Sequence, residues 1–249
     1  MTCMNVTSYK TRPLVPPKDD LFPVLRESLP TPHQKDIVCI SSKILSIHEG
    51  RTLPMEGTDK AELIKQEADW YLDARKISKF RAFFTIAKGA MIGSSGIDES
   101  NGSGHYILYP KDPFKSAKNI RTWLMKEYGL KEIGVIICDS TSIPLRRGAI
   151  GFALSWDGFD PLRDYRGTKD IFGRIIQIEM ANLVDALASS AVLAMGEGSE
   201  QTPLAVITDA PNIVFKNRSR KKEQLIVEPA GDIFAPLFWN GRPWKKGRK

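Results

Sequence analysis

The chain has 249 residues, of which 42% are hydrophobic and 26% are charged, as in an ordinary globular protein of one or two domains. The net charge is +7, and all of the excess lies at the C-terminal end. Residues 216–249 contain ten Lys or Arg and three acids, while residues 1–215 contain 26 residues of each sign. This distribution excludes a uniformly basic nucleic-acid-binding domain. No apolar run approaches the ~20 residues that cross a bilayer, and the first residues hold no signal-peptide core, so we expect a cytoplasmic protein without a membrane partner.

In the first third of the chain, short apolar runs alternate with proline- or glycine-containing segments that interrupt helices and strands. Residues 1–18 contain several prolines and predict an extended entry segment. DIVCISS at residues 36–42 predicts a buried strand. A helix is expected over residues 59–76, because Asp59 can cap its first turn. Residues 80–93 are expected to form one or two strands around a Lys-Gly turn.

The middle of the chain contains the clearest helix signal. Residues 113–128 predict a helix that Asp112 caps, that has proline at its first position and that Gly129 ends. IGVIIC at residues 133–138 predicts a buried strand with Asp139 at its carboxyl end. Ligand sites often lie at the carboxyl ends of such strands.

The last third begins with a long polar segment. Residues 155–174 predict a loop of functional length, and residues 175–179 are compatible with a strand. Residues 181–195 predict a buried, alanine-rich helix, and LAVIT at residues 204–208 predicts another buried strand. Residues 209–249 form a basic C-terminal extension whose charge runs are expected to be solvated or partly disordered.

Two carboxylates and an arginine pair follow or precede short apolar runs. They are Asp98 in GIDESN, Asp139 in IICDST, and Arg146 with Arg147 in LRRG. Carboxylates hold hard divalent cations, and arginine forks bind phosphate or carboxylate with paired hydrogen bonds. Either aspartate alone is more typical of a turn or a helix cap than of a metal site. The chain contains neither a GxxxxGK[ST] phosphate loop nor a GxGxxG fingerprint, so a nucleotide would be held in another way.

The order of several segments resembles one family. GIDESN, IICDST, LRRGAIGFA, PLRDYRGTKDIFGR and LASSAVLAMGEG follow one another as they do in coenzyme F-420:L-glutamate ligases. The resemblance runs from about residue 12 to about residue 208 and is most specific between Ser95 and Gly198. It implies that residues 1–208 form a γ-glutamyl ligase-like catalytic region and that residues 209–249 lie outside it.

Members of that family add L-glutamate in γ-linkage to a deazaflavin cofactor, using GTP and divalent metal. We therefore expect an α+β fold of mixed sheets with flanking helices, two interleaved lobes and an intertwined homodimer. The expected reaction passes through an acyl phosphate of the acceptor, with no covalent nucleophile from the protein.

The resemblance also implies site residues. Asp98, Asp139, Ser140 and, less directly, Glu197 would bind two Mg²⁺ or Mn²⁺ ions. Arg146 and Arg147 would bind phosphate or a polyanionic acceptor, although exposed charge explains them equally well. The nucleotide site would include Arg12, Pro13, Leu14, Val15, Ser42, Lys43, Asn101, Met195, Gly196, Glu197 and Gly198. The two glycines could instead end the preceding helix.

One departure from the family concerns nucleotide binding. Ile47 stands where many relatives carry lysine, and Lys43 is a candidate substitute for that cation. Nucleotide selectivity between GTP and ATP is therefore expected to be loose. Two alternatives remain open from the sequence: a γ-glutamyl ligase for folate or another pterin-like acceptor, and a non-catalytic relative that binds nucleotide or cofactor.

Overall fold

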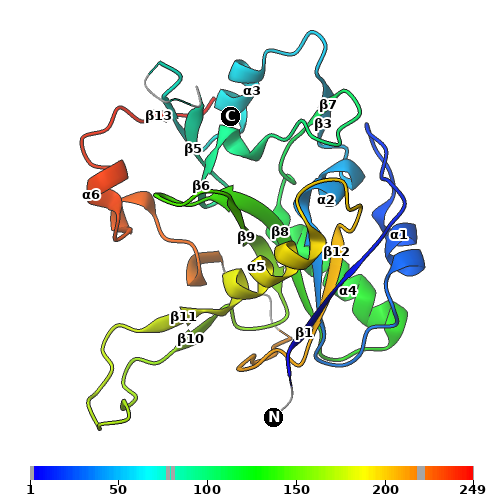
Figure 1. Ribbon diagram of the computed structural model, residues 1–249, viewed down its shortest axis with the longest axis vertical. Helices are drawn as coiled ribbons and strands as arrows, with labels where there is room; N and C mark the ends of the chain where they lie inside the picture. The colour runs from blue at the N-terminus through cyan, green and yellow to red at the C-terminus, as the bar shows by residue number, and fades with distance from the viewer. Residues whose placement is uncertain (1–2, 77–78, 80–81, 218–221, 249) are drawn as a thin grey trace.

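A five-stranded mixed sheet forms the centre of the protein in the computed structural model, which describes residues 3–76, 79, 82–217 and 222–248 (Figure 1). In spatial order the strands are β1 (Asn5–Tyr9), β12 (Leu204–Thr208), β2 (Ile37–Ser41), β8 (Gly134–Ser142) and β9 (Ala149–Asp157). Only β2 and β8 are parallel, and the other neighbours pair antiparallel. The expected mixed sheet with flanking helices is confirmed, and the strands expected at residues 36–42 and 204–208 correspond to β2 and β12.

Both faces of this sheet are buried, because alternate residues of each central strand contribute to different cores. One core includes Val38, Ile40, Val135 and Ile137 and is covered by α1 (Leu21–Ser28), α2 (Ser42–His48) and α4 (Pro113–Tyr128). The other includes Ile37, Cys39, Ile136 and Cys138 and is covered by α5 (Leu183–Met195). Burial on both faces explains why β2 and the first half of β8 are continuous apolar runs.

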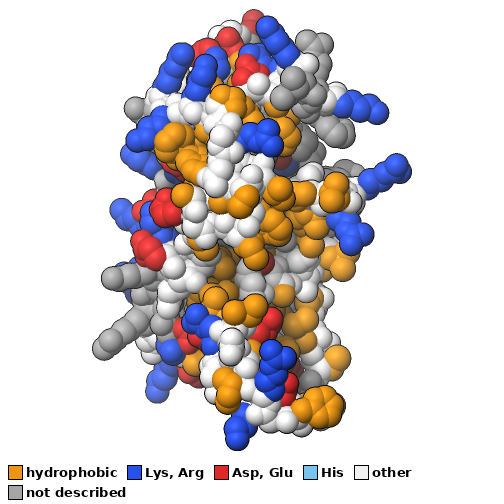
Figure 2. All heavy atoms as spheres, turned by 90° about the vertical axis from the view of Figure 1, so that its left-hand side faces the viewer, with side chains coloured by type: hydrophobic (Ala, Val, Ile, Leu, Met, Phe, Trp, Pro, Cys, Tyr) orange, Lys and Arg blue, Asp and Glu red, His pale blue; other side chains and the backbone are white. Residues whose placement is uncertain are grey.

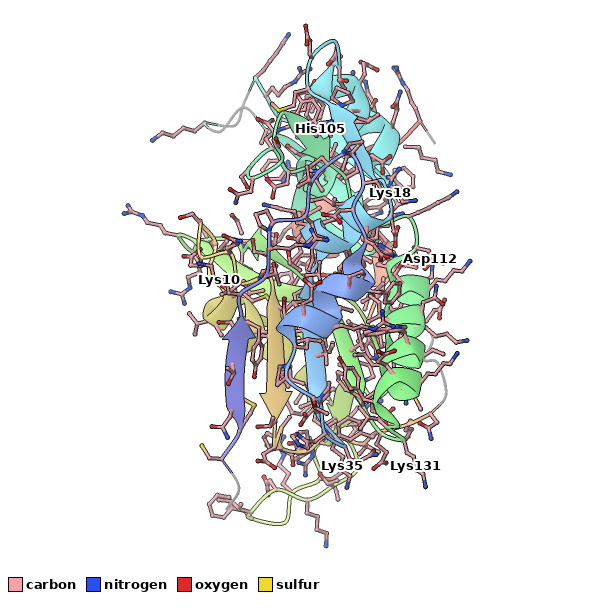
Figure 3. All side chains as sticks on the ribbon, turned by 90° about the vertical axis from the view of Figure 1, so that its right-hand side faces the viewer. Lys10, Lys18, Lys35, His105, Asp112 and Lys131 are labelled. Carbon is pink, nitrogen blue, oxygen red and sulfur yellow. The ribbon has the colours of Figure 1, made fainter. Side chains whose placement is uncertain are left out.

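The two long helices follow their local signals. The Asp112 side chain accepts a hydrogen bond from the Lys115 N–H, and Gly129 ends α4 with φ at 66°. Figure 3 shows α4 running from Asp112 toward Lys131 beside the sheet. Asn182 caps α5 in the same way, through the Asp185 N–H. Both predicted helices are therefore confirmed to within two residues at each end.

A second, four-stranded sheet has the order β13-β4-β5-β6. Its strands are β13 (Lys245–Lys246), β4 (Trp70–Asp73), β5 (Phe83–Ala87) and β6 (Ala90–Gly93). The expected Lys88–Gly89 turn joins β5 and β6, and residues 80 and 81 of the predicted strand lie outside the described residues. The helix expected over residues 59–76 is wrong beyond its first half: α3 spans Lys60–Glu67, and the next residues pair with β5 because Tyr71 is buried in a core of its own.

The C-terminal extension lies against this second sheet. β13 pairs with β4, and the Trp239 ring contacts the Trp70 ring edge-on at a centroid distance of 5.1 Å. The Gly247 N–H donates to the Asp69 carbonyl at 3.1 Å, and Arg248 forms an ion pair with Glu62 at 3.0 Å. The charge run over residues 242–249 was expected to be solvated or partly disordered. Its charged residues Arg242, Lys245, Lys246 and Arg248 are exposed, as expected, whereas its backbone is paired with the second sheet and its neighbours as far as residue 248. Part of the other charge run, residues 218–221, lies outside the described residues.

Two β-hairpins extend from the central sheet. β8 does not end before Asp139 as expected but continues to Ser142, where a turn leads into β9. The loop expected over residues 155–174 is interrupted by the end of β9 and by β10 (Leu162–Asp164). No strand covers residues 175–179, which are part of the described chain, because β10 pairs instead with β11 (Met180–Asn182). Residues 162–182 thus form an arm that projects from the body (Figure 1).

The remaining elements are short. A two-stranded ladder joins β3 (Thr52–Pro54) to β7 (His105–Ile107), and α6 (Ala235–Phe238) lies in the extension. Three single 3₁₀ turns are η1 (Ser94–Gly96), η2 (Lys222–Gln224) and η3 (Pro229–Gly231). In the described part of the chain, no helix has the length and apolar character to cross a membrane.

Candidate functional site

The candidate site lies where the parallel pairing of β2 with β8 ends, at Ser41 and Cys138. Because the two strands run in the same direction, Lys43 in the first turn after β2 and Asp139 in β8 come to the same edge of the sheet. The burial pattern of β8 changes there, since Val135–Cys138 are buried and the residues from Asp139 onward are partly exposed. Asp139 therefore stands where the sheet leaves the core.

The GIDESN segment supplies the second carboxylate. Asp98 follows η1 and bridges to Ile107, the last residue of β7. Its Oδ2 receives an ion pair from Lys43 Nζ at 2.7 Å, and its Oδ1 accepts hydrogen bonds from the Ser100 N–H at 2.7 Å and the Ser100 hydroxyl at 2.8 Å. The structure thus brings Lys43 and Asp98 together, and a lysine-neutralised carboxylate lies beside Asp139.

The segment that carries Asp98 has an unusual backbone. Ser94, Ser95, Asn101 and Ser103 all have φ between 47° and 57°, a left-handed region that non-glycine residues seldom adopt. Ser95 is fixed there, because its buried hydroxyl donates to the Ile64 carbonyl at 2.9 Å and its N–H donates to the Thr85 hydroxyl at 2.8 Å. Several such residues in one segment cost stability and are typical of ligand sites that are held in shape before binding.

The two aspartates have opposite electrostatic environments. Burial alone would raise the pKa of Asp98, but hydrogen bonds and charge from Lys43, together with Ser100, lower it overall. For Asp139, burial raises the pKa to about 6, against the opposing effects of Tyr109 and the Ser140 N–H, and the nearby charge of Asp98 adds to the rise. Two close carboxylates, of which only one has a cation, form a site suited to an additional positive charge.

The segment after α5 closes the other side of the site. The Glu197 Oε2 atom lies 3.1 Å from the Ser140 hydroxyl, and Asn101 Nδ2 donates to the Gly198 carbonyl at 3.1 Å. Gly196 has φ at 79°, and the Gly198 N–H donates to Glu200 at 2.8 Å. The predicted residues Asn101, Ser140, Glu197 and Gly198 are therefore neighbours, and Met195 is the buried last residue of α5.

The predicted RPLV segment approaches this region without reaching the carboxylates. Thr11 and Gln201 exchange hydrogen bonds, from the Thr11 N–H at 3.1 Å and from Gln201 Nε2 at 2.6 Å, which ties the segment to the chain after α5. The Arg12 guanidinium is already paired with both oxygens of Asp19, at 2.6 and 2.9 Å. Of the neighbouring residues, Leu14 is buried in the core, whereas Pro13 and Val15 are exposed.

Four other residues that the sequence singled out do not contact the two carboxylates. Arg146 and Arg147 are exposed in the turn between β8 and β9, beyond Ser142 at the end of β8. Ile47 is 2% exposed and packs in the main core, so its side chain does not replace a lysine at the surface of the site. Ser42 is 5% exposed at the start of α2, where it supports Lys43.

Sequence reasoning missed two residues of the site. Ser100 contacts both Asp98 and Lys43, and the Asp-x-Ser spacing is a recognisable signal for such a local turn. Tyr109 is 3% exposed, and its hydroxyl is close enough to influence the pKa of Asp139. No sequence signal marks Tyr109, because its position next to Asp139 depends on a contact between segments far apart in the chain.

A metal ion fits this donor set only with help from a ligand. Among the described residues, no group of three or more His, Cys, Asp or Glu is arranged to hold a metal. Asp98 and Asp139, with the Ser140 hydroxyl, are hard oxygen donors, and Mg²⁺ is usually held by one or two carboxylates together with substrate phosphates and water. The excess negative charge and the unpartnered, buried Tyr109 hydroxyl are consistent with a site that a ligand completes.

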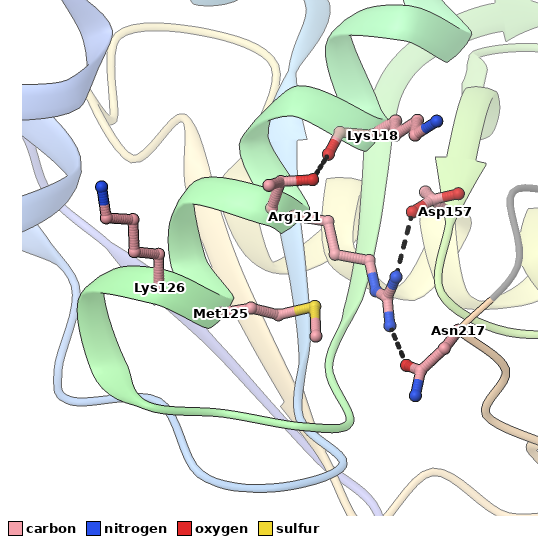
Figure 4. A pocket seen from close by; sticks show the side chains of 7 residues that line it. Lys118, Arg121, Met125, Lys126, Asp157 and Asn217 are labelled. Atoms are coloured by element: carbon pink, nitrogen blue, oxygen red, sulfur yellow. Dashed lines mark hydrogen bonds and ion pairs between the residues drawn. The ribbon is translucent and has the colours of Figure 1, made fainter.

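One hollow outside this site lies at the opposite end of the sheet. It has a volume of about 460 Å³ and is lined by α4, Asp157 and Asn217 (Figure 4). Asp157 pairs with Val135 at the start of β8, whereas Asp139 pairs with Phe152 farther along. Arg121 in its wall is already bonded to Asp157 at 3.4 Å and to Asn217 at 2.8 Å, so this hollow offers no free guanidinium.

Comparisons with known proteins identify close similarity. The family profile described as "F420-0:Gamma-glutamyl ligase" matches residues 11–209. A protein named coenzyme F420:L-glutamate ligase from Methanopyrus kandleri is 31% identical over 236 residues, covering 88% of this chain and 93% of that protein. Proteins of the same name from Methanococcus maripaludis and Methanocaldococcus jannaschii are 33% and 35% identical, and cover 85% and 80% of this chain and 83% and 84% of their own lengths.

Proposed function

The chain belongs to the F420-0:gamma-glutamyl ligase family and is a ligase, and from that premise we propose that it joins L-glutamate in γ-linkage to a deazaflavin acceptor at the expense of GTP. The observation that carries the proposal is the convergence of Lys43, Asp98 and Asp139 at one edge of the sheet, within the matched residues. The proposed place of action is the cytoplasm.

The proposed reaction has two steps, a phosphoryl transfer from GTP to the acceptor and an acyl transfer from the acceptor to glutamate. A carboxylate oxygen of the acceptor attacks the γ-phosphorus of GTP, the bond from that phosphorus to the β,γ-bridging oxygen breaks, and GDP leaves. The amine of glutamate then attacks the acyl carbon of the resulting acyl phosphate, the bond to the phosphate oxygen breaks, and the amine proton is lost to solvent. The products are the γ-glutamyl amide, GDP and phosphate.

The protein side chains bind and orient in this scheme. Asp98, Asp139 and Ser140 would hold Mg²⁺ or Mn²⁺, with Glu197 as a candidate for a second ion, and such ions supply neutralisation of phosphate charge. Lys43 would be available to bind a phosphate oxygen once a divalent cation neutralised Asp98, because its ammonium group stands on a flexible stem.

The nucleotide lies along the segments that surround the carboxylates. Asn101 and the backbone of residues 195–198 form one wall, and residues 12–15 form the approach to it. Arg146 and Arg147 are placed for the acceptor, since they are exposed beyond the end of β8. Their forked donors suit the phosphate or carboxylate groups of a polyanionic acceptor.

A homodimer is part of the proposal. The arm of residues 162–182 carries Ile171, Phe172 and Ile178, which are 92%, 89% and 87% exposed. Figure 2 shows further hydrophobic side chains spread over the side of the molecule that carries α6 and β13. Exposed apolar side chains at this density are typical of an interface. Light scattering would give twice the chain mass for a dimer, and a monomer at micromolar concentration would contradict this part of the proposal.

The test of function is a product assay. The protein would be incubated with Mg²⁺ or Mn²⁺, L-glutamate, GTP or ATP, and either the deazaflavin acceptor or a reduced folate, and mass spectrometry would detect an added glutamyl unit. The proposal predicts a glutamylated deazaflavin that depends on nucleotide and metal, with either GTP or ATP accepted. Glutamylated folate alone would assign the pterin-like acceptor instead, and no product together with no nucleotide binding would indicate a non-catalytic relative.

A further inference from the structure

The Tyr109 hydroxyl is the buried polar group in the site that has no role in the binding scheme above. Tyr109 is 3% exposed, and its hydroxyl has no hydrogen-bond partner of acceptable geometry among the described residues. Burial, followed by the charge of Asp139, raises the pKa of this phenol well above its usual value, so the group is a neutral donor. Buried polar groups normally have partners, and an exception calls for a functional explanation.

The ring cannot turn to another partner, because the surrounding backbone holds it. Gly96 has φ at 68°, and a Cβ at that position would overlap the Tyr109 ring. The ring therefore lies directly against the Gly96 backbone. The Tyr109 carbonyl accepts from Arg51 Nε at 3.0 Å, and Arg51 is itself bonded to Glu67 at 2.5 Å. The hydroxyl therefore keeps its direction toward the carboxylates.

Of the two carboxylates, Asp139 has the larger free capacity to accept this hydrogen bond. Asp98 already receives the Ser100 N–H, the Ser100 hydroxyl and Lys43. Asp139 receives a single N–H, from Ser140 at 2.8 Å. Hydrogen bonds of ligand-binding groups are often long in a free site and tighten on binding.

We propose that Tyr109 is a positioning residue whose hydroxyl donates to Asp139 in the ligand-bound site and orients that carboxylate toward the cation that would bind there. The inference rests on the proposed function and deepens it. A donor behind a metal-binding carboxylate fixes its orientation, and removal of such a group typically lowers metal affinity 10- to 100-fold.

The test is Tyr109→Phe, which keeps the ring against Gly96 and removes only the hydroxyl. We expect a melting temperature equal to or above that of the wild type, because an unpartnered buried hydroxyl is lost. Titration calorimetry with Mn²⁺ and GTP should show affinity reduced about 10-fold or more. The matched control is Tyr106→Phe, a buried tyrosine that packs in the core of the second sheet and should bind as the wild type does.

Wild-type affinity in Tyr109→Phe would overturn the inference, and so would a loss of affinity accompanied by a large drop in melting temperature, which would mean a structural role. Asp139→Asn distinguishes a failure of the positioning role of Tyr109 from a failure of the proposed function. If Asp139→Asn loses binding while Tyr109→Phe retains it, the positioning role fails and the proposed function stands. If the wild type itself shows no metal-dependent GTP binding, both fail.

Discussion

Replacement of Asp139 by asparagine should make the ligand-free protein more stable at neutral pH while abolishing metal-dependent GTP binding. Burial raises the pKa of Asp139 to about 6, and a rise from the ordinary value near 3.8 corresponds to about 3 kcal/mol of unfavourable free energy for the ionised form. The residue retains partial exposure, which screens its charge, so we expect a gain of about 1–2 kcal/mol. The Ser140 N–H bond is kept, since Asn also offers an Oδ1.

The stabilisation by Asp139→Asn should depend on pH. Between pH 4 and pH 6 the folded protein binds more protons at Asp139 than the unfolded chain, so the contribution of this group to the free energy of unfolding falls as pH rises. Urea unfolding at pH 4.5 and pH 7.5 should show the stabilisation by Asp139→Asn at pH 7.5 and little at pH 4.5. Asp73→Asn, an exposed residue paired with Arg75, is the control.

A lower stability of Asp139→Asn at pH 7.5 would refute the electrostatic reasoning. Undiminished metal-dependent GTP binding in the same variant would refute the assignment of Asp139 to the metal. Because stability and binding are predicted to change in opposite directions, general misfolding cannot imitate the result.

Three further predictions concern the surroundings of the site. Lys43→Met should weaken GTP binding and move the acid limb of its pH profile upward, because Lys43 lowers the pKa of Asp98; an unchanged profile would contradict that role. Arg146→Ala and Arg147→Ala should leave melting temperature and GTP affinity unchanged and raise KM for the acceptor, which steady-state kinetics would measure; a lowered GTP affinity would place them at the nucleotide instead. Deletion of residues 242–249 should lower unfolding free energy by about 1–3 kcal/mol through loss of β13, with the maximal rate at low temperature nearly unchanged. A collapse of that rate in the folded truncated protein would show that the extension acts on the site.

The parts of the fold that were predictable from sequence are those with local causes. Asp112 and Gly129 mark the ends of α4 because a cap needs only neighbouring residues. Strand β4 was not predictable, because it depends on contacts with distant residues. Trp70 pairs with Ile86 in β5, and its ring contacts the ring of Trp239. Strand β9 contains Gly151, which reads as a breaker but is required because a Cβ there would lie 2.6 Å from Val192 Cβ in α5.

The sequence motifs named several residues that the structure brings together, but not Ser100 or Tyr109 and not the contacts between them. The motifs identify Asp98, Asp139 and Lys43, but the ion pair between Lys43 and Asp98 follows from the way a left-handed segment at Ser94 and Ser95 brings the GIDESN loop to α2. Ile47 is buried in the core, so its side chain does not reach the site, and the expected loose selectivity between GTP and ATP stays a prediction.

The proposed reaction transfers a phosphoryl group to the carboxylate of the acceptor before glutamate attacks. The direct measurement uses an acceptor with both carboxylate oxygens labelled with ¹⁸O, incubated with GTP, L-glutamate and Mn²⁺, followed by mass analysis of the released phosphate. Each released phosphate should carry one ¹⁸O atom, and the amount of labelled phosphate should equal the amount of glutamylated product. Glutamylated product formed with unlabelled phosphate would contradict the acyl-phosphate route and the proposed use of the site.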